Sequence, residues 1–141
     1  MLIEEPEKID KHTVGIILTY KGKYLLTHRT LDALWGSVAG WIEEGETPEQ
    51  AIIREIKEEL GIDLEPEFFT TTYHNYDGKA IAYHIFTFDF KEDPSEKIAL
   101  NDELALGFKF ISLEEALKLD LFEDEDYVKT LHHKRKQAEN I

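Results

Sequence analysis

The sequence has 141 residues, of which 42% are hydrophobic and 11% aromatic, so it holds enough apolar material for the core of one domain. It contains no cysteine, which excludes a disulfide framework, a Cys-ligated metal site and a cysteine nucleophile. Its formal net charge of −14 disfavours general binding to nucleic acid or to an anionic membrane surface.

No apolar run approaches the roughly 18 residues needed to span a bilayer, and the first residues lack the basic and apolar regions of a signal peptide. We therefore expect a cytoplasmic protein with a single domain over residues 1–141. Its partner would be a small molecule, with no nucleic acid and no membrane, and the chain would act as a monomer or a homodimer. The acidic surplus either makes a soluble surface or gathers divalent cations, and composition leaves both open.

Short strands are expected in the first part of the chain. Residues 1–11 are polar and acidic and predict a loosely held lead-in. Two apolar runs, at 13–20 and 24–27, flank a Lys-Gly-Lys turn and predict a β-hairpin. Residues 29–36 are expected to be irregular, and a short apolar piece at 38–42 leads into a Glu-Glu-Gly-Glu turn.

The clearest predicted element is a helix over residues 48–60. Thr47 is a suitable N-cap, Pro48 suits the first helical position, and Gln50 stands three residues after the cap. Gly61 supplies the usual C-terminal stop. The apolar residues that recur at helical spacing on one face are Ala51, Ile52, Ile56 and Leu60.

The rest of the chain predicts two long antiparallel strands and two further helices. Residues 68–76 and 80–90 are rich in Thr, Tyr, Phe and Ile and flank an Asp-Gly turn. After a polar loop over 91–101, the expected elements are a short strand at 108–111, a helix from a Ser112 cap to about 119, and an amphipathic helix over 123–133. Strands and helices in this order predict an α/β (α+β) fold, an α/β/α sandwich with a mixed β-sheet.

Three glutamates on the predicted helix are the first candidates for chemistry. Glu55, Glu58 and Glu59 stand at i, i+3 and i+4, so their side chains project from one face within one turn. Glutamate is also a good helix former, and charge runs usually mark solvated faces. These three residues by themselves leave both a surface role and a metal site open.

The segment around them carries a longer pattern. Residues 40–62, GWIEEGETPEQAIIREIKEELGI, resemble the Nudix box, G-x5-E-x7-R-E-U-x-E-E-x-G-U, where U is a bulky aliphatic residue. Arg29, Trp35-Gly36 and the later segment FKFISLEEAL extend the resemblance loosely over residues 13–120. Every specified position of the box is matched, by Gly40, Glu46, Arg54, Glu55, Ile56, Glu58, Glu59, Gly61 and Ile62.

This resemblance implies the Nudix fold and metal-dependent hydrolysis of a diphosphate linkage. A diphosphate resists water because its oxygens are negative, so hydrolysis needs a cation that neutralises them. Carboxylate oxygens suit Mg²⁺ or Mn²⁺, and the resemblance assigns Glu55, Glu58 and Glu59 as the ligands. It adds the backbone carbonyl of Ala39, which stands where many members have the middle residue of Pro-Gly-Gly. It also implies a carboxylate from a downstream loop, for which Glu103 is the candidate and Asp102 the next.

Other side chains are expected to support this chemistry. Arg54 cannot bind a metal, and we expect it to pair with Glu46 and to orient that carboxylate. Arg29 is a candidate for a phosphate contact, because arginine is the preferred phosphate partner, although it is also common on surfaces. The aromatic residues that could stack on a base, or simply pack, are Trp35, Trp41, Tyr73 and Tyr76.

The favoured substrate is nucleoside triphosphate-like, within the class of nucleoside diphosphates linked to another moiety. The resemblance leaves dinucleoside polyphosphates open, since Tyr76 stands near a tyrosine found in those hydrolases, and it also leaves nucleotide sugars open. Isopentenyl diphosphate isomerase shares the fold but uses a cysteine, which this chain lacks. A noncatalytic nucleotide-binding module is the alternative from another class, but such modules typically lose box glutamates.

Overall fold

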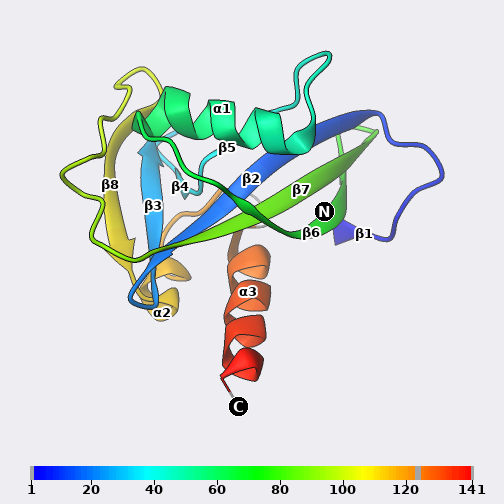
Figure 1. Cartoon of the computed structure of the whole chain (residues 1–141). Helices are drawn as coiled ribbons and strands as arrows, with labels where there is room; N and C mark the ends of the chain where they lie inside the picture. Colours follow the sequence, from blue (N-terminus) through cyan, green and yellow to red (C-terminus); the bar gives the residue numbers. More distant parts are fainter. Residues whose placement is uncertain (1, 123–124, 141) are drawn as a thin grey trace.

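Eight strands and three helices make up the part of the chain that the structure describes, residues 2–122 and 125–140 (Figure 1). The structure is a computed structural model. The strands are β1 (Leu2–Ile3), β2 (Lys11–Tyr20), β3 (Lys23–Arg29), β4 (Trp35–Gly36), β5 (Ala39–Trp41), β6 (Glu67–Tyr76), β7 (Lys79–Phe90) and β8 (Ala105–Ile111). The helices are α1 (Pro48–Leu60), α2 (Leu113–Ala116) and α3 (Glu125–Glu139).

The strands form one mixed sheet in the order β1-β6-β7-β2-β3-β4, with β5 paired to β2 and β8 paired to β3. β2 and β7 run parallel along the whole of β2, whereas the other pairs are antiparallel. β2 and β3 pair at their hairpin end, and further along β5 pairs with β2 and β4 with β3. The chain over 35–41 therefore crosses from β3 to β2, which places Ala39 opposite Gly15 and Gly40 opposite Val14.

Helices cover both faces of the sheet: α1 lies on one face, and α2 and α3 lie on the other (Figure 1). Alternate residues of β2 point to opposite faces of the sheet and pack in the hydrophobic core on each face. Ile16 and Leu18 belong to the core that contains Ile52 and Ile56 of α1, and Ile17 packs in a cluster with Val128 of α3. Burial on both faces explains why this strand is an almost unbroken apolar run. The predicted α/β/α sandwich with a mixed sheet is confirmed.

The predicted helix over 48–60 has the predicted ends. The Thr47 hydroxyl accepts a hydrogen bond from the Gln50 N–H at 3.1 Å, and the Gln50 side chain accepts one from the Thr47 N–H at 3.0 Å. Gly61 caps the C-terminus in the left-handed region, with φ of 70°, and its N–H donates to the Lys57 carbonyl. This capping and the buried apolar face give α1 a fixed register on the sheet, which fixes the direction of each glutamate.

Two expectations for the first part of the chain were wrong. Residues 1–11 are not simply a lead-in, because Leu2 and Ile3 pair with β6 and add a strand to the sheet. Residues 29–36 are not irregular throughout, because Trp35 and Gly36 form β4 against β3. Both strands have two residues, too few to show an alternating apolar pattern. Pairing forms them, with the distant β6 in the case of β1 and with the preceding β3 in the case of β4.

The last two helices differ in length from the prediction. α2 begins at its Ser112 cap but ends at Ala116, and the chain continues in tighter turns to Leu119 rather than as helix. α3 extends to Glu139 instead of ending near His133, while residues 123 and 124 of the predicted helix lie outside the described residues. None of the helices in the described residues has a segment long and apolar enough to cross a membrane.

A buried ion pair on α3 supports the chain between β4 and β5. Lys129 Nζ donates to Glu125 Oε2 at 2.9 Å, and both residues are buried. The Ser37 N–H and hydroxyl donate to the same carboxylate at 3.3 and 3.2 Å. A buried charge that loses its partner is strongly destabilising. The pair therefore holds Ser37 in place, two residues before Ala39.

Candidate active site

Arg54 is the centre of the polar network at the Nudix-like segment. The expected pairing with Glu46 is present in bidentate form, with Nε 2.7 Å from Glu46 Oε2 and Nη2 3.0 Å from Oε1. Nη2 also donates to the Trp41 carbonyl at 3.1 Å, and Nη1 donates to Glu55 at 2.8 Å and to Glu58 at 3.3 Å. One guanidinium thus ties the loop before α1 to two glutamates on the helix.

Charge pairing changes the acidity of the groups around this network. The hydrogen bond from Arg54 holds the pKa of the Glu46 carboxyl below its usual value. The carboxylates raise the pKa of Arg54 in turn, chiefly through the Glu46 hydrogen bond. Glu46 and Arg54 therefore remain charged throughout the neutral pH range, and the fork geometry that joins them persists with them.

Glu55 lies against the backbone of β5. A side chain at Gly40 would overlap its carboxylate, so the absence of a Cβ at this position makes room for the acid. The Glu55 side chain is 15% exposed. Burial raises its pKa, against the opposing effect of the Arg54 hydrogen bond. Gly40 is needed here for close approach of a carboxylate, while the carbonyl of Ala39 is one residue away.

Glu59 is the most buried of the three helix glutamates, with 8% of its surface exposed. The Thr27 hydroxyl on β3 donates to its Oε1 at 2.8 Å and fixes the direction of the carboxyl group. Burial raises the pKa of Glu59 to about 7, although the Thr27 hydrogen bond acts to lower it. At neutral pH this carboxyl therefore exchanges readily between its neutral and its charged form.

Glu58 differs from its two neighbours, because its side chain is 49% exposed and its described ion pair is with Arg54. Among residues 2–122 and 125–140, no group of three or more His, Asp or Glu side chains is already arranged as a metal site. The helix thus turns Glu55 and Glu59 inward and leaves Glu58 at the surface. Movement of Arg54 Nη1 away from Glu55 and Glu58 would free both carboxylates for a cation.

Glu103, the candidate from the downstream loop, lies beside the C-terminal end of α1. The Asn101 N–H donates to the Glu59 carbonyl at 3.0 Å, and the Glu103 N–H donates to the Asn101 side chain at 3.1 Å. The loop is therefore anchored at the glutamate that the prediction makes a ligand. The Glu103 side chain is exposed, and its described contacts do not include the carboxylates of the box.

The two predicted substrate-binding residues have different positions. Arg29 lies beside Gly36, with an ion pair to Asp32 at 3.2 Å and its guanidinium 4.0 Å from the centre of the Phe122 ring. It is also near enough to Glu59 to oppose the rise in the pKa of that carboxyl. Tyr76 is 59% exposed at the turn between β6 and β7. The described contacts do not bring Tyr76 to the box.

Sequence reasoning missed several supporting residues. Thr27 carried no signal, because a threonine in a strand is ordinary and its contact with Glu59 joins residues 32 positions apart. Asn101 and Ser37 were also overlooked, since both act through backbone or loop contacts. Glu125 could be found only through the packing of α3 against the sheet.

The NUDIX domain model matches residues 10–131 of this chain. The chain belongs to the Nudix family. It is 34% identical over 98 residues to Nudix hydrolase 26, chloroplastic, of Arabidopsis thaliana, an alignment that covers 68% of this chain and 40% of that protein. It is 39% identical over 69 residues to the dihydroneopterin triphosphate diphosphatase of Escherichia coli strain K12, covering 45% of this chain and 46% of that protein. The chain thus spans less than half the length of these curated relatives.

A solved structure has the same fold. The bifunctional NMN adenylyltransferase/ADP ribose pyrophosphatase from Francisella tularensis, complexed with AMP and an Mn ion, superposes with a TM-score of 0.71 at 27% identity. The match covers 93% of this chain and 43% of that chain. The family membership expected from the box and the Nudix fold expected from the chain order are both confirmed.

The contact between Gly40 and Glu55 in this Nudix site leads to a first prediction. Gly40→Ala should displace the Glu55 carboxylate and lower turnover about 100-fold, because a misplacement of about 1 Å at a site can cost that much. The free energy of unfolding should fall by only about 1–3 kcal/mol, as for overpacking elsewhere. Steady-state rates and thermal unfolding measure both effects.

Gly107→Ala is the matched control for this prediction. A Cβ at Gly107 in β8 would meet no atom within 4 Å, so this variant should retain the parent turnover. If Gly40→Ala were as active as Gly107→Ala, the close approach of Glu55 to β5 would have no role in activity.

Proposed function

We propose that this Nudix chain is a metal-dependent pyrophosphohydrolase that cleaves the diphosphate linkage of a nucleoside diphosphate bonded to another moiety. The observation that carries the proposal is the complete box with Arg54 bound to Glu46, Glu55 and Glu58. Glu55 and Glu59 are partly buried and repel each other, and a bound divalent cation would relieve that repulsion. The curated relatives are named as a hydrolase and a diphosphatase, which supports the same class.

The residues present fit Mg²⁺ or Mn²⁺. Glu55 and Glu59 are desolvated carboxylates with raised pKa values, and such oxygens gain most from a hard divalent cation. Glu55, Glu58, Glu59 and the Ala39 carbonyl would hold the metal. When bound, it would neutralise the charge on the diphosphate oxygens and lower the pKa of water at the site. The relative that was solved with an Mn ion supports this choice.

The remaining roles belong to the chain itself. Arg54 orients Glu46 and lowers the repulsion among the helix carboxylates, and Thr27 holds the Glu59 carboxyl in one direction. Arg29 would release Asp32 to pair with a phosphate. Glu103, an exposed carboxylate on the loop anchored at Glu59, would be the group for proton transfer, while Glu58 would act as a metal ligand. The catalytic set in this proposal is Glu46, Arg54, Glu58, Glu59 and Glu103.

A nucleoside triphosphate-like compound is the favoured substrate. Dihydroneopterin triphosphate, named for the Escherichia coli relative, is a triphosphate of this kind. Tyr76 has no described contact with the box, so the case for dinucleoside polyphosphates, which rested on that residue, gains no support from its contacts. ADP-ribose, named for the Francisella relative, and nucleotide sugars remain members of the test panel.

The test is release of phosphate or diphosphate from a panel of nucleoside triphosphates, dihydroneopterin triphosphate, ADP-ribose and diadenosine tetraphosphate. We expect turnover of at least one compound with Mg²⁺ or Mn²⁺, and its loss in excess EDTA, because the carboxylates cannot neutralise a diphosphate by themselves. Restoring the metal should restore the rate. Full turnover in EDTA would overturn the metal proposal, and no turnover of any member would favour the noncatalytic module.

A further inference from the structure

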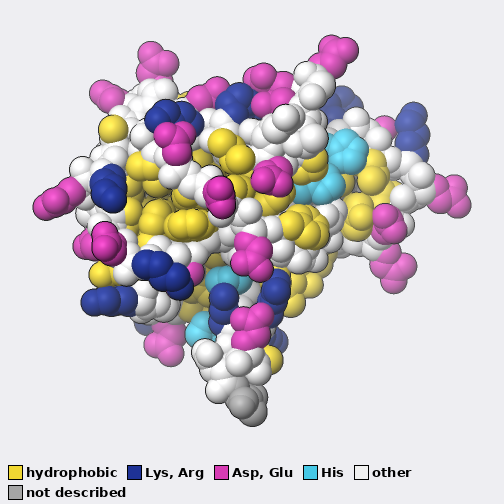
Figure 2. Space-filling view, viewed as in Figure 1, with side chains coloured by type: hydrophobic (Ala, Val, Ile, Leu, Met, Phe, Trp, Pro, Cys, Tyr) yellow, Lys and Arg dark blue, Asp and Glu magenta, His cyan; other side chains and the backbone are white. Residues whose placement is uncertain are grey.

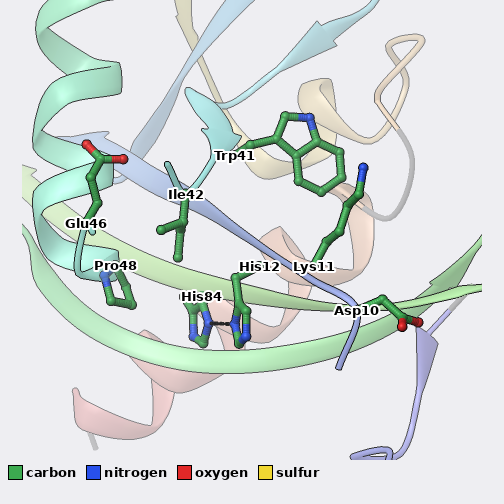
Figure 3. A pocket seen from close by; sticks show the side chains of 8 residues that line it. All are labelled: Asp10, Lys11, His12, Trp41, Ile42, Glu46, Pro48 and His84. Carbon is green, nitrogen blue, oxygen red and sulfur yellow. Dashed lines mark hydrogen bonds between the residues drawn. The ribbon is translucent and has the colours of Figure 1, made fainter. Parts of the chain in front are cut away.

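A cleft of about 670 Å³ opens beside the box, at the N-terminal end of α1 (Figure 3). This volume lies in the range of small-molecule sites. Figure 2 shows histidines next to hydrophobic side chains on the surface of the molecule. Figure 3 shows a histidine pair on one side of the cleft and an indole on the other. The lining residues are Asp10, Lys11, His12, Trp41, Ile42, Glu46, Pro48 and His84.

The histidine pair gives the cleft a fixed polar wall. His12 Nδ1 and His84 Nε2 share a hydrogen bond of 2.9 Å, and the rings are parallel within 7°. His84 Nδ1 also shares a hydrogen bond of 3.0 Å with the Thr71 hydroxyl. Both nitrogens of His84 are thus engaged, and it holds His12 in one orientation. Among the described residues no hydrogen bond to His12 Nε2 is found, so this nitrogen would meet the ligand.

The opposite wall is apolar and aromatic. Trp41 is 49% exposed although it lies in β5, and Ile42 and Pro48 continue the apolar surface. The Lys11 ammonium lies 4.9 Å from the centre of the Trp41 ring, which holds the indole at the edge of the cleft. A half-exposed indole, held in place, offers a flat surface on which another ring can stack.

The charges in the cleft favour a neutral ring over a phosphate. The Asp10 carboxylate opposes the Lys11 ammonium, and the Glu46 carboxylate already balances the Arg54 guanidinium, so the cleft lining has no surplus of positive charge to attract an anion. Burial and the neighbouring His12 lower the pKa of His84, which keeps this imidazole neutral at neutral pH. A ring with hydrogen-bond donors and acceptors on its edge can instead use the Asp10 carboxylate and the His12 imidazole.

We propose that the cleft binds the planar nitrogen heterocycle of the substrate, a nucleobase or a pterin, stacked on Trp41 and hydrogen-bonded to His12. The inference rests on the proposed function, because it assigns the cleft to the group attached to the diphosphate. Glu46 connects the two parts of the site, since it lines the cleft and also pairs with Arg54. The phosphates would lie at the box and the heterocycle in the cleft.

The experiment separates binding of the ring from hydrolysis. The full chain, without metal, is titrated with guanosine, adenosine, neopterin and, as a control, ribose, and the indole N–H signals of its two tryptophans are followed by ¹H–¹⁵N NMR. Trp41→Phe assigns the Trp41 signal. We expect a saturable shift of that signal with at least one heterocyclic compound and none with ribose.

Trp41→Ala and His12→Ala should each raise the Kd for that compound about tenfold, the usual scale for loss of base stacking or of a polar contact. Tyr127→Ala is the matched control, because Tyr127 is an exposed aromatic residue on α3, across the sheet from α1. It should leave the Kd unchanged. For any compound that is hydrolysed, the cleft variants should raise KM about tenfold and change kcat less than about twofold.

The outcomes distinguish this inference from the proposed function. Binding of a heterocycle at Trp41 without hydrolysis of any panel member would support the heterocycle site and overturn the proposed pyrophosphohydrolase activity. Hydrolysis with no shift of the Trp41 signal by any of the three ring compounds would overturn the proposal that the cleft binds the heterocycle. A shift caused by inorganic phosphate but by none of the ring compounds would overturn it as well, in favour of an anion site.

Discussion

Glu59→Gln is expected to lower turnover by more than about 100-fold, because it removes a ligand charge that stabilises the reaction by several kcal/mol. The same change should stabilise the metal-free protein at pH 8. Glu59 is buried and its pKa is raised from 4.5 to about 7. A shift of this size means that ionising Glu59 costs the folded state about 3 kcal/mol more than the unfolded state. Glutamine keeps the shape and the Thr27 hydrogen bond without that charge.

The pH dependence of stability follows with a definite sign. Between pH 4.5 and about 7 the folded state holds a proton on Glu59 that the unfolded state has released. The contribution of Glu59 to the free energy of unfolding of the metal-free wild type should therefore fall as the pH rises through this window. The glutamine variant should lack this part of the fall.

Denaturant unfolding at a series of pH values in EDTA, together with steady-state rates in saturating Mg²⁺, measures both effects. Glu65→Gln is the control, because Glu65 lies outside the box and no contact between Glu65 and the box is described. A glutamine variant of Glu59 with the wild-type rate would show that this carboxylate is not a ligand. An unchanged pH profile of stability would show that burial does not raise its pKa.

Arg54→Lys is expected to lower the turnover rate about 10- to 100-fold, the usual range for changes at residues that orient metal ligands. The lysine ammonium keeps the charge, but one compact group cannot reach the separate acceptors on Glu46, Glu55 and Trp41 that three different guanidinium nitrogens contact. Metal affinity and melting temperature should change less than the rate. Arg54→Ala should lose more turnover than Arg54→Lys, because it also removes the charge.

Steady-state rates at saturating metal, metal titrations and thermal unfolding test the role of Arg54. Arg135→Lys is the matched control, because Arg135 lies on α3 in an exposed ion pair with Glu139 and should tolerate the change. If Arg54→Lys were as active as the wild type, charge alone would account for Arg54. An equal loss in Arg54→Lys and Arg54→Ala would show that the planar fork accounts for the whole effect.

The local sequence determined where α1 begins and ends and how the residues of the box are spaced. Capping by Thr47, Pro48 and Gln50 and the stop at Gly61 depend on bonds between neighbouring residues, so they could be predicted without the fold. The spacing of Arg54 from Glu46 and Glu55 likewise follows from one loop and one helix. The family, the fold and the Arg54–Glu46 pair were therefore accessible from the residues themselves.

Only the tertiary structure decided which carboxylates are buried and what lies beside them. Glu55, Glu58 and Glu59 are equivalent in sequence, but the sheet buries Glu59 against Thr27 and leaves Glu58 half exposed. The short strand β1 and the His12–His84 pair depend on contacts between residues far apart in the chain. Such contacts depend on strand register and on side-chain burial, which no local pattern encodes.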